Sequence, residues 1–301
     1  MVRNNVERTS VLFKIPKSNY FYTSKLSCKK LHYTDSNLNL IGFEQLDPVY
    51  NRPDIVLDSI GKYFGNKDQG MIDEYRKSWQ KRIDHLDLDK EKLGKGEIAV
   101  PNAEIMEADN IAYENKDGNL VINVKANDPK YMLRRFNVYV NEVPLYGSEG
   151  ISIASRGLRE WDTTVSVPLG VGENKIQVSV MNELGLENFK YPSYVNYTPE
   201  KEIVAKTHYI GIGVNEFLMK ENNLTYCVKD VNDLANALKD KNTIVKLYTN
   251  QKATRENILA LKQYLKDSTT VNDKVIISCS SHGLLDDSLN FYFLVKIFMN
   301  F

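Results

Sequence analysis

The sequence predicts a multi-domain protein in which a helical hairpin is followed by an all-β sandwich and then by a doubly wound α/β sheet. Apolar residues recur at helical spacing in the first part and alternate with polar residues, in short runs, in the second. In the third part, continuous apolar strands alternate with amphipathic helices. The expected boundaries are 1–52 for an N-terminal segment or linker, 53–100 for the hairpin, 117–199 for the sandwich and 203–301 for the α/β domain.

The charge balance and the cysteine content exclude several classes of function. The 301 residues carry 39 basic and 39 acidic side chains, so the formal net charge is zero, and no nucleic-acid partner is expected because such proteins need a basic footprint. The three cysteines, Cys28, Cys227 and Cys279, are far apart and contain no C-x-x-C pair. We therefore expect no disulfide framework, no metal site and no cofactor.

The N-terminal segment shows neither a signal peptide nor a membrane helix, because its apolar runs are as short as Val11-Leu12-Phe13. A cytoplasmic protein with no membrane partner is expected. Residues 1–34 are basic, which indicates an anionic partner, a solvated tail or a cut-off remnant of something longer.

Two helices are expected between Pro53 and Leu86. Pro53 suits a first helical turn, and Gly65-Asn66 ends the first helix. The apolar faces are Ile55, Val56, Ile60 and Phe64 in the first helix, and Ile72, Tyr75, Trp79, Ile83 and Leu86 in the second. We interpret Tyr75 and Trp79 as packing residues.

Short alternating strands and glycine-rich turns between 117 and 199 predict an antiparallel sandwich. The run Gly172 to Val180 resembles the late hairpin of bacterial immunoglobulin-like modules, which implies an Ig-like sandwich with possible protein partners. It offers no catalytic constellation. Tyr191, Tyr194 and Tyr197 are interpreted as a binding strip or as packing at strand ends.

After residue 203, strands at 207–214, 244–248 and 275–281 alternate with helices at 228–238 and 255–266. This order predicts a doubly wound parallel sheet in outline. Thr254 is expected to cap the second helix. His282-Gly283 follows the third strand, where open α/β sheets place their functional residues. By itself, His-Gly at a strand end is also compatible with a structural turn.

Four segments together resemble the caspase-like cysteine peptidases, in their bacterial or metacaspase-like branch. They are the strand 209–214 with Asn215, the helix start 224–231, the helix entry 249–258, and Ile277 to Gly283 with its terminal His-Gly. Residues 47–56 also look like a linker found after WD-repeat modules in large bacterial proteins of this kind. The resemblance implies a cysteine-type endopeptidase that acts on a peptide or protein substrate.

The resemblance also assigns roles to residues. His282 matches the catalytic histidine, and Gly283 matches the glycine whose N–H helps to bind the oxyanion. Asp230 matches a carboxylate that binds a basic side chain before the cleaved bond, and Cys227 matches the pocket wall. For Asp230, an N-terminal helix residue favoured by the helix dipole is the equal alternative.

One family feature is missing. The nucleophilic cysteine of caspases follows the histidine by about 50 residues, which here would lie beyond residue 301. Cys279 and His282 should point to opposite faces of their strand. The chain is therefore expected to be C-terminally truncated and inactive by itself. The resemblance implies that three strands of an incomplete sheet are present, in the spatial order 2-1-3.

Two alternatives remain open from the sequence. One is a non-enzymatic interaction or scaffold protein with a degenerate caspase-like domain. The other is a dinucleotide fold suggested by Gly211-x-Gly213, in which the expected third glycine is replaced by Glu216.

Overall fold

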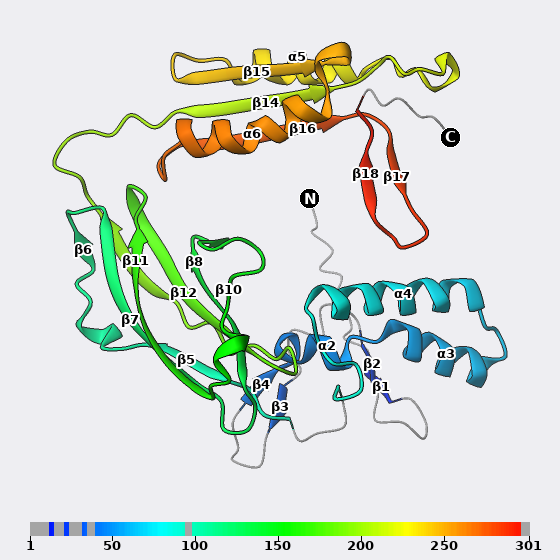
Figure 1. The fold of residues 1–301 in the computed structure, drawn as a ribbon, viewed down its shortest axis with the longest axis vertical. Helices are drawn as coiled ribbons and strands as arrows, with labels where there is room; N and C mark the ends of the chain where they lie inside the picture. The colour runs from blue at the N-terminus through cyan, green and yellow to red at the C-terminus, as the bar shows by residue number, and fades with distance from the viewer. Residues whose placement is uncertain (1–11, 15–20, 24–31, 35–39, 94–97, 296–301) are drawn as a thin grey trace, which may run out of the picture. The chain divides into compact units, whose positions relative to one another are not determined.

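The computed structural model describes residues 12–14, 21–23, 32–34, 40–93 and 98–295 (Figure 1). Most of the predicted N-terminal segment, with Cys28 and much of the basic arm, lies outside these ranges. The chain divides into two compact units, 1–113 with 119–167 and 174–195, and 114–118 with 168–173 and 196–301. The described residues form mostly β-sheet with a few helices. None of the described helices is long and apolar enough to cross a bilayer.

Two short antiparallel ladders precede the helices. β1 (Leu12–Lys14) pairs with β2 (Phe21–Thr23), and β3 (His32–Thr34) pairs with β4 (Leu40–Gly42). The chain continues through η1 (Phe43–Leu46) and α2 (Asp47–Tyr50) into the helical hairpin.

The hairpin consists of α3 (Pro53–Phe64) and α4 (Gln69–His85), close to the predicted ranges. Gly65 ends α3 with φ 74°, a left-handed conformation that glycine adopts without a Cβ penalty. Asp68 caps α4 by accepting a hydrogen bond from Met71 N. Phe64 and Tyr75, which the periodicity assigns to packing faces, are 67% and 43% exposed.

The sandwich has two sheets. Their orders are β11-β7-β5 and β10-β8-β12-β13-β6, with β9 pairing to β8. The strands are β5 (Asn102–Ile105), β6 (Glu114–Asn115), β7 (Asn119–Asn127), β8 (Leu133–Val140), β9 (Val143–Pro144), β10 (Ile151–Ser152), β11 (Glu160–Pro168), β12 (Gly172–Asn182) and β13 (Ser193–Tyr197).

The sandwich core follows the predicted alternation. On β7, Ile122 and Val124 are each 1% exposed. Val121, whose side chain points to the other face of the same strand, is 60% exposed. β5 lies before residue 117, where we expect the sandwich to begin, and pairs antiparallel with β7. The sheet therefore includes residues that lie before the predicted start of the sandwich.

The α/β part consists of three parallel strands in the order β15-β14-β16, which is the predicted order 2-1-3. In chain order the elements are β14 (Thr207–Gly213), η4 (Lys220–Asn222), α5 (Cys227–Leu238), β15 (Thr243–Thr249), η5 (Asn250–Lys252), α6 (Arg255–Ser268) and β16 (Lys274–Ser280). Thr254 caps α6 through Asn257 N, as predicted.

The two faces of β14 contact different helices. Tyr209 donates a hydrogen bond to Val231 O of α5, whereas His208 bonds to Tyr264 of α6. A Cβ on Gly213 would lie 2.7 Å from Cys227 O, so glycine is needed for the close approach of α5. Gly211 and Gly213 thus lie within a strand under a helix, which rules out the phosphate-binding turn of a dinucleotide fold.

A hairpin of β17 (Gly283–Leu285) and β18 (Phe291–Phe293) follows β16. The Asp286 carboxylate holds its turn by accepting from the backbone N–H groups of Ser288 and Asn290. Residues 291–293 are thus paired in a strand, and residues 296–301 lie outside the described residues.

Candidate functional site

The candidate site is centred on His282, two residues after the end of β16. Its Nε2 lies 2.8 Å from the carbonyl oxygen of Asn222, and its ring centroid lies 5.0 Å from that of Phe217. A carbonyl oxygen can only accept, so Nε2 must carry the hydrogen of this bond. In the neutral imidazole, the lone pair is then on Nδ1, which is the atom left to act as a base.

Gly283 follows His282 and begins β17. Bonds from Leu294 N to His282 O and from Asp286 N to Asn290 O identify the hydrogen-bonded pairs of the β17–β18 ladder. These pairs alternate with non-bonded ones, so Gly283, opposite Phe293, directs its N–H away from β18. The geometry leaves this N–H available to a ligand beside His282.

The surroundings of His282 are apolar. A small hollow is lined by Phe217, Leu218, Met219, Asn222, His282, Leu294 and Val295. Leu218 is 67% exposed and Met219 is 46% exposed. Exposed apolar side chains therefore border the His282 imidazole.

Asp230 and Cys227 both lie in the first turn of α5. Asp230 is exposed, and its carboxylate has no hydrogen-bond or ion-pair partner among the described residues apart from the nearby charge of Lys229. Cys227 is 8% exposed, and its carbonyl faces Gly213. The Asp230 carboxylate is thus accessible to a cationic ligand. Its place in the first turn of α5 equally fits a residue that the helix dipole favours at a helix start.

Cys279 lies within β16 on the α6 side of the sheet, because it pairs with Ile212, whereas Ser280 pairs with Gly213 under α5. His282 lies beyond a bend at Ser281, where strand alternation no longer applies, and its ring contacts Phe217, which packs against the α6-side cluster. The strand register therefore does not show the predicted opposite orientation of Cys279 and His282. Partial desolvation also raises the pKa of the Cys279 thiol, which disfavours the thiolate.

The sequence patterns missed a group of asparagines around the site. Asn215 and Asn223 bond to the backbone of the loop that carries Asn222. The Asn222-Asn223 pair between two elements was the available signal, since asparagine side chains commonly bond to nearby backbone.

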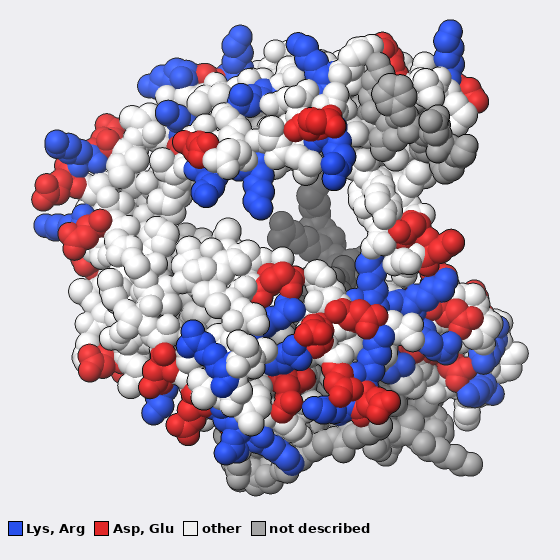
Figure 2. Space-filling view, viewed as in Figure 1, with Lys and Arg blue, Asp and Glu red and all other residues white. Residues whose placement is uncertain are grey.

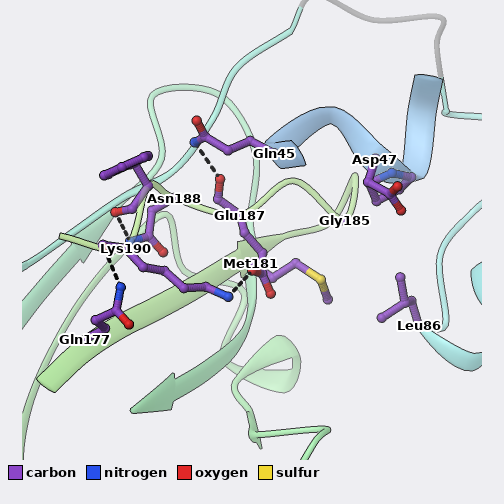
Figure 3. Close-up of a pocket in the computed structure, with 11 residues that line it drawn as sticks. Gln45, Asp47, Leu86, Gln177, Met181, Gly185, Glu187, Asn188 and Lys190 are labelled. Carbon is purple, nitrogen blue, oxygen red and sulfur yellow. Dashed lines mark hydrogen bonds and ion pairs between the residues drawn. The ribbon is translucent and has the colours of Figure 1, made fainter. Parts of the chain in front are cut away.

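A second hollow, of about 460 Å³, lies on the first unit and is lined by Gln45, Asp47, Pro48, Leu86, Gln177, Met181, Gly185, Glu187, Asn188, Phe189 and Lys190 (Figure 3). Its polar groups bond to one another. Lys190 Nζ lies 2.8 Å from Glu187 Oε2, and Gln45 donates to Glu187 O. None of the site residues predicted from the sequence lines this hollow.

The tyrosines of the predicted strip separate in the structure. Tyr191 and Tyr194 are 68% and 47% exposed, whereas the Tyr197 ring lies against Gly118. The ring of Tyr191 stacks at 4.7 Å from that of Phe189. Packing at strand ends therefore describes Tyr197, and the other two tyrosines lie on the surface.

The surface charges are mixed. Figure 2 shows basic and acidic side chains next to one another over much of the face that it draws. In the part of the chain that the structure describes, no group of three or more His, Cys, Asp or Glu side chains is arranged to hold a metal ion.

No family model and no curated protein matches the chain. Among solved structures, it is similar to fibronectin(III)-like modules of Clostridium thermocellum CbhA, with 13% identity over 35% of this chain and 50% of that chain, at a TM-score of 0.27. A chitin-binding domain from Burkholderia pseudomallei has 11% identity over 29% of this chain and 57% of that one, at 0.21.

A variant of the SrpA adhesin of Streptococcus sanguinis has 8% identity over 48% of this chain and 82% of that one, at a TM-score of 0.24. The chain thus spans about half the length of the first two structures. At these scores, nothing about those proteins transfers to this chain. The caspase-like resemblance rests on the residues of this sequence alone.

Proposed function

We propose that this chain supplies the histidine part of a caspase-like cysteine-type endopeptidase site. One observation carries the proposal. His282 lies just beyond the carboxyl end of β16, with Nε2 held by the Asn222 carbonyl and Nδ1 left as the base. Gly283 provides an outward backbone N–H at the adjacent position.

The chemistry that these groups support is acyl transfer. Nδ1 of His282 takes the proton of a cysteine thiol, and the thiolate adds to the scissile carbonyl carbon. The Gly283 N–H donates to the oxygen that becomes negatively charged. The imidazolium then returns its proton to the leaving amine as the C–N bond breaks, and water hydrolyses the thioester in a second, equivalent cycle.

The nucleophile of this proposal is neither described cysteine. Cys279 lies within β16, before the end of the strand, and Cys227 is buried. β16 has β14 on one side and no other neighbouring strand within the described residues. A further parallel strand beside β16 would bring its carboxyl end, and a thiol there, next to His282, because parallel strands end at the same edge of a sheet.

Asp230 is proposed to bind the side chain before the cleaved bond. Its carboxylate is exposed and lacks a hydrogen-bond partner in the described structure, so it can pair with an Arg or Lys of the substrate. The substrate class is therefore a peptide or protein with a basic residue at that position.

The test uses fluorogenic peptides with Arg, Lys or Asp before the cleaved bond. Residues 1–301 should give no turnover, whereas a longer chain with a cysteine-bearing strand after residue 301 should cleave the basic peptides. His282→Ala should abolish that cleavage. Turnover by residues 1–301 that disappears in Cys279→Ser or Cys227→Ser would overturn the assignment of the nucleophile.

A non-enzymatic interaction protein is the second candidate. It is favoured by the exposed aromatic side chains Phe189, Tyr191 and Tyr194 on the sandwich, together with the lack of a suitably placed thiol among the described residues. In that case the longer chain would show no peptidase activity, and Tyr191→Ser would weaken binding to a protein partner without changing the melting temperature.

A further inference from the structure

The loop between β14 and α5 is closed by a single residue, Asn215. Its Oδ1 accepts from Val228 N at 3.0 Å, its Nδ2 donates to Thr225 O at 3.1 Å, and its own carbonyl accepts from Leu224 N at 2.9 Å. Asn215 N in turn donates to the Asn250 side chain at 2.8 Å. One asparagine therefore ties the end of a buried strand to both the loop and the first turn of α5.

Asn223 connects the two loop residues that contact His282. Its Oδ1 accepts from Phe217 N at 2.8 Å, and the Phe217 ring packs against the His282 ring. Asn223 also directly follows Asn222, whose carbonyl accepts from His282 Nε2. The Asn223 side chain thus connects the residue of the ring contact to the segment that carries the carbonyl, and the backbone bonds from Asn222 N to Met219 O and from Asn223 N to Lys220 O hold that segment locally.

We infer that Asn215 and Asn223 are positioning residues, which act through the loop 215–225 to hold the His282 imidazole in the form with its hydrogen on Nε2. The inference rests on the proposed function for its catalytic meaning. Neither asparagine touches a substrate in this scheme. The physical reason is that a carbonyl can select a tautomer only if the backbone that carries it is fixed.

The test reads the tautomer of His282 directly. The chain has 4 histidines, so the imidazole ¹⁵N signals of His282 are assigned by comparison with His282→Gln. In residues 1–301, His282 should show the single form with protonated Nε2. In Asn223→Ala, that single-form signal should be lost to an averaged one, while amide spectra show that the α/β part remains folded.

Matched variants separate positioning from general stability. Asn223→Asp keeps an acceptor oxygen for Phe217 N and should restore the single form. Asn232→Ala removes an asparagine that donates to Val228 O within α5, and it should leave the His282 signals unchanged. If Asn215→Ala unfolds the start of α5, the His282 signals of Asn223→Ala and Asn223→Asp still test the inference.

The inference and the proposed function fail differently. An unchanged tautomer in Asn223→Ala overturns the inference, whatever the activity. In a catalytically competent longer chain, Asn223→Ala should lower kcat by on the order of tenfold or more with little change in KM, because misplacement of a base by about 1 Å can cost a hundredfold. A tautomer change with no peptidase activity in any chain would instead overturn only the proposed function.

Discussion

Asp54 shows how one buried charge organises the helical hairpin. The residue is 1% exposed, and it accepts from Arg52 Nε at 2.9 Å and Nη2 at 2.7 Å. Burial by itself would raise the pKa of Asp54, but the hydrogen bonds and charge of Arg52 lower it below its ordinary value. Arg52 also lies 3.9 Å over the Trp79 ring, whose N–H donates to Pro48 O. The predicted packing role of Trp79 is confirmed.

We predict that Asp54→Ala destabilises the first unit by about 3 kcal/mol or more, because it leaves Arg52 without its buried partner. Urea unfolding followed by tryptophan fluorescence measures the change. Glu74→Ala is the control, since the exposed pair of Glu74 and Lys77 should contribute about 1 kcal/mol or less. Equal effects of the two substitutions would contradict the role given to Asp54.

Asp230 gives a prediction about specificity in a catalytically competent longer chain. Asp230→Asn should lower kcat/KM for Arg and Lys peptides by at least about tenfold, since a hydrogen bond to a charged group contributes about 1.5–3 kcal/mol. Asp233 lies three residues further along α5 and pairs with Lys229, so Asp233→Asn should have little effect on kcat/KM. If the preference for basic peptides survives in Asp230→Asn, this residue is a helix-start residue.

At the scale of elements, the turn between α3 and α4 depends on Asp58. Lys62 and Lys67 both bond to its carboxylate, at 2.6 and 2.7 Å. Hydrogen bonds from these two ammonium groups lower the pKa of Asp58 to about 2. Lys67 lies between the helices, so the carboxylate connects α3 to the chain segment that leads into α4.

The lowered pKa predicts a pH-dependent contribution to stability. It is fully present above the unfolded pKa of 3.8 and is lost as the pH falls through the folded value of about 2. Asp58→Asn should therefore lower the melting temperature at pH 7, and the difference from wild type should shrink between about pH 4 and pH 2. A difference that stays constant over this range would show that the charge of Asp58 does not contribute.

The outer edge of β16 carries exposed apolar side chains. Ile277 is 53% exposed and Val275 is 39% exposed, on a strand with one neighbour in the described structure. Unpaired apolar edges of this kind promote association between chains. The edge is also where the proposed function needs a further strand.

We predict that Ile277→Lys reduces hydrophobic-dye binding and light scattering of residues 1–301, because a charge on an edge strand opposes pairing with another chain. Val121→Lys is the matched control, since Val121 is 60% exposed on β7, which is paired on both sides. The edge assignment is wrong if the control reduces scattering as much as Ile277→Lys does.

At the scale of the molecule, the helical hairpin and the sandwich belong to one compact unit. Leu184 and Leu186 of the sandwich form a cluster with Ile41 and Leu46, which precede the hairpin. A Cβ on Gly185 would lie 2.4 Å from Leu88, which follows it. Arg134 of β8 donates to Asp87 O at 2.8 Å. The sandwich core is thus closed by residues outside 117–199.

This arrangement predicts how fragments behave. Residues 40–199 should unfold cooperatively, because they keep β5 and the cover of Leu184 and Leu186. Residues 117–199 should bind a hydrophobic dye and melt at a lower temperature or without cooperativity, since they expose both leucines and lose an edge strand. Heat denaturation followed by circular dichroism compares them. Equal melting temperatures would show that the cover contributes no stability.

Periodicity and turn chemistry by themselves determined much of the fold. Alternation placed Ile122 and Val124 in the sandwich core, and Gly65 and Thr254 marked helix ends, because these signals depend on neighbours in the sequence. The three strands β14, β15 and β16 were predicted from the alternation of strands and helices, and their order 2-1-3 from the family resemblance. The alternation of strands and helices also placed His282-Gly283 at a strand end.

Only the tertiary structure decided which side chains meet across the chain. Asn222, 60 residues before His282, supplies the carbonyl that holds its imidazole, and no local pattern encodes such a pair. The exposure of Tyr75 and Tyr191, and the cover of Leu184 by Ile41, likewise depend on which surfaces dock. The reason is physical: local propensity fixes the backbone over a few residues, whereas burial and long-range hydrogen bonds depend on surfaces that exist only after the elements have packed.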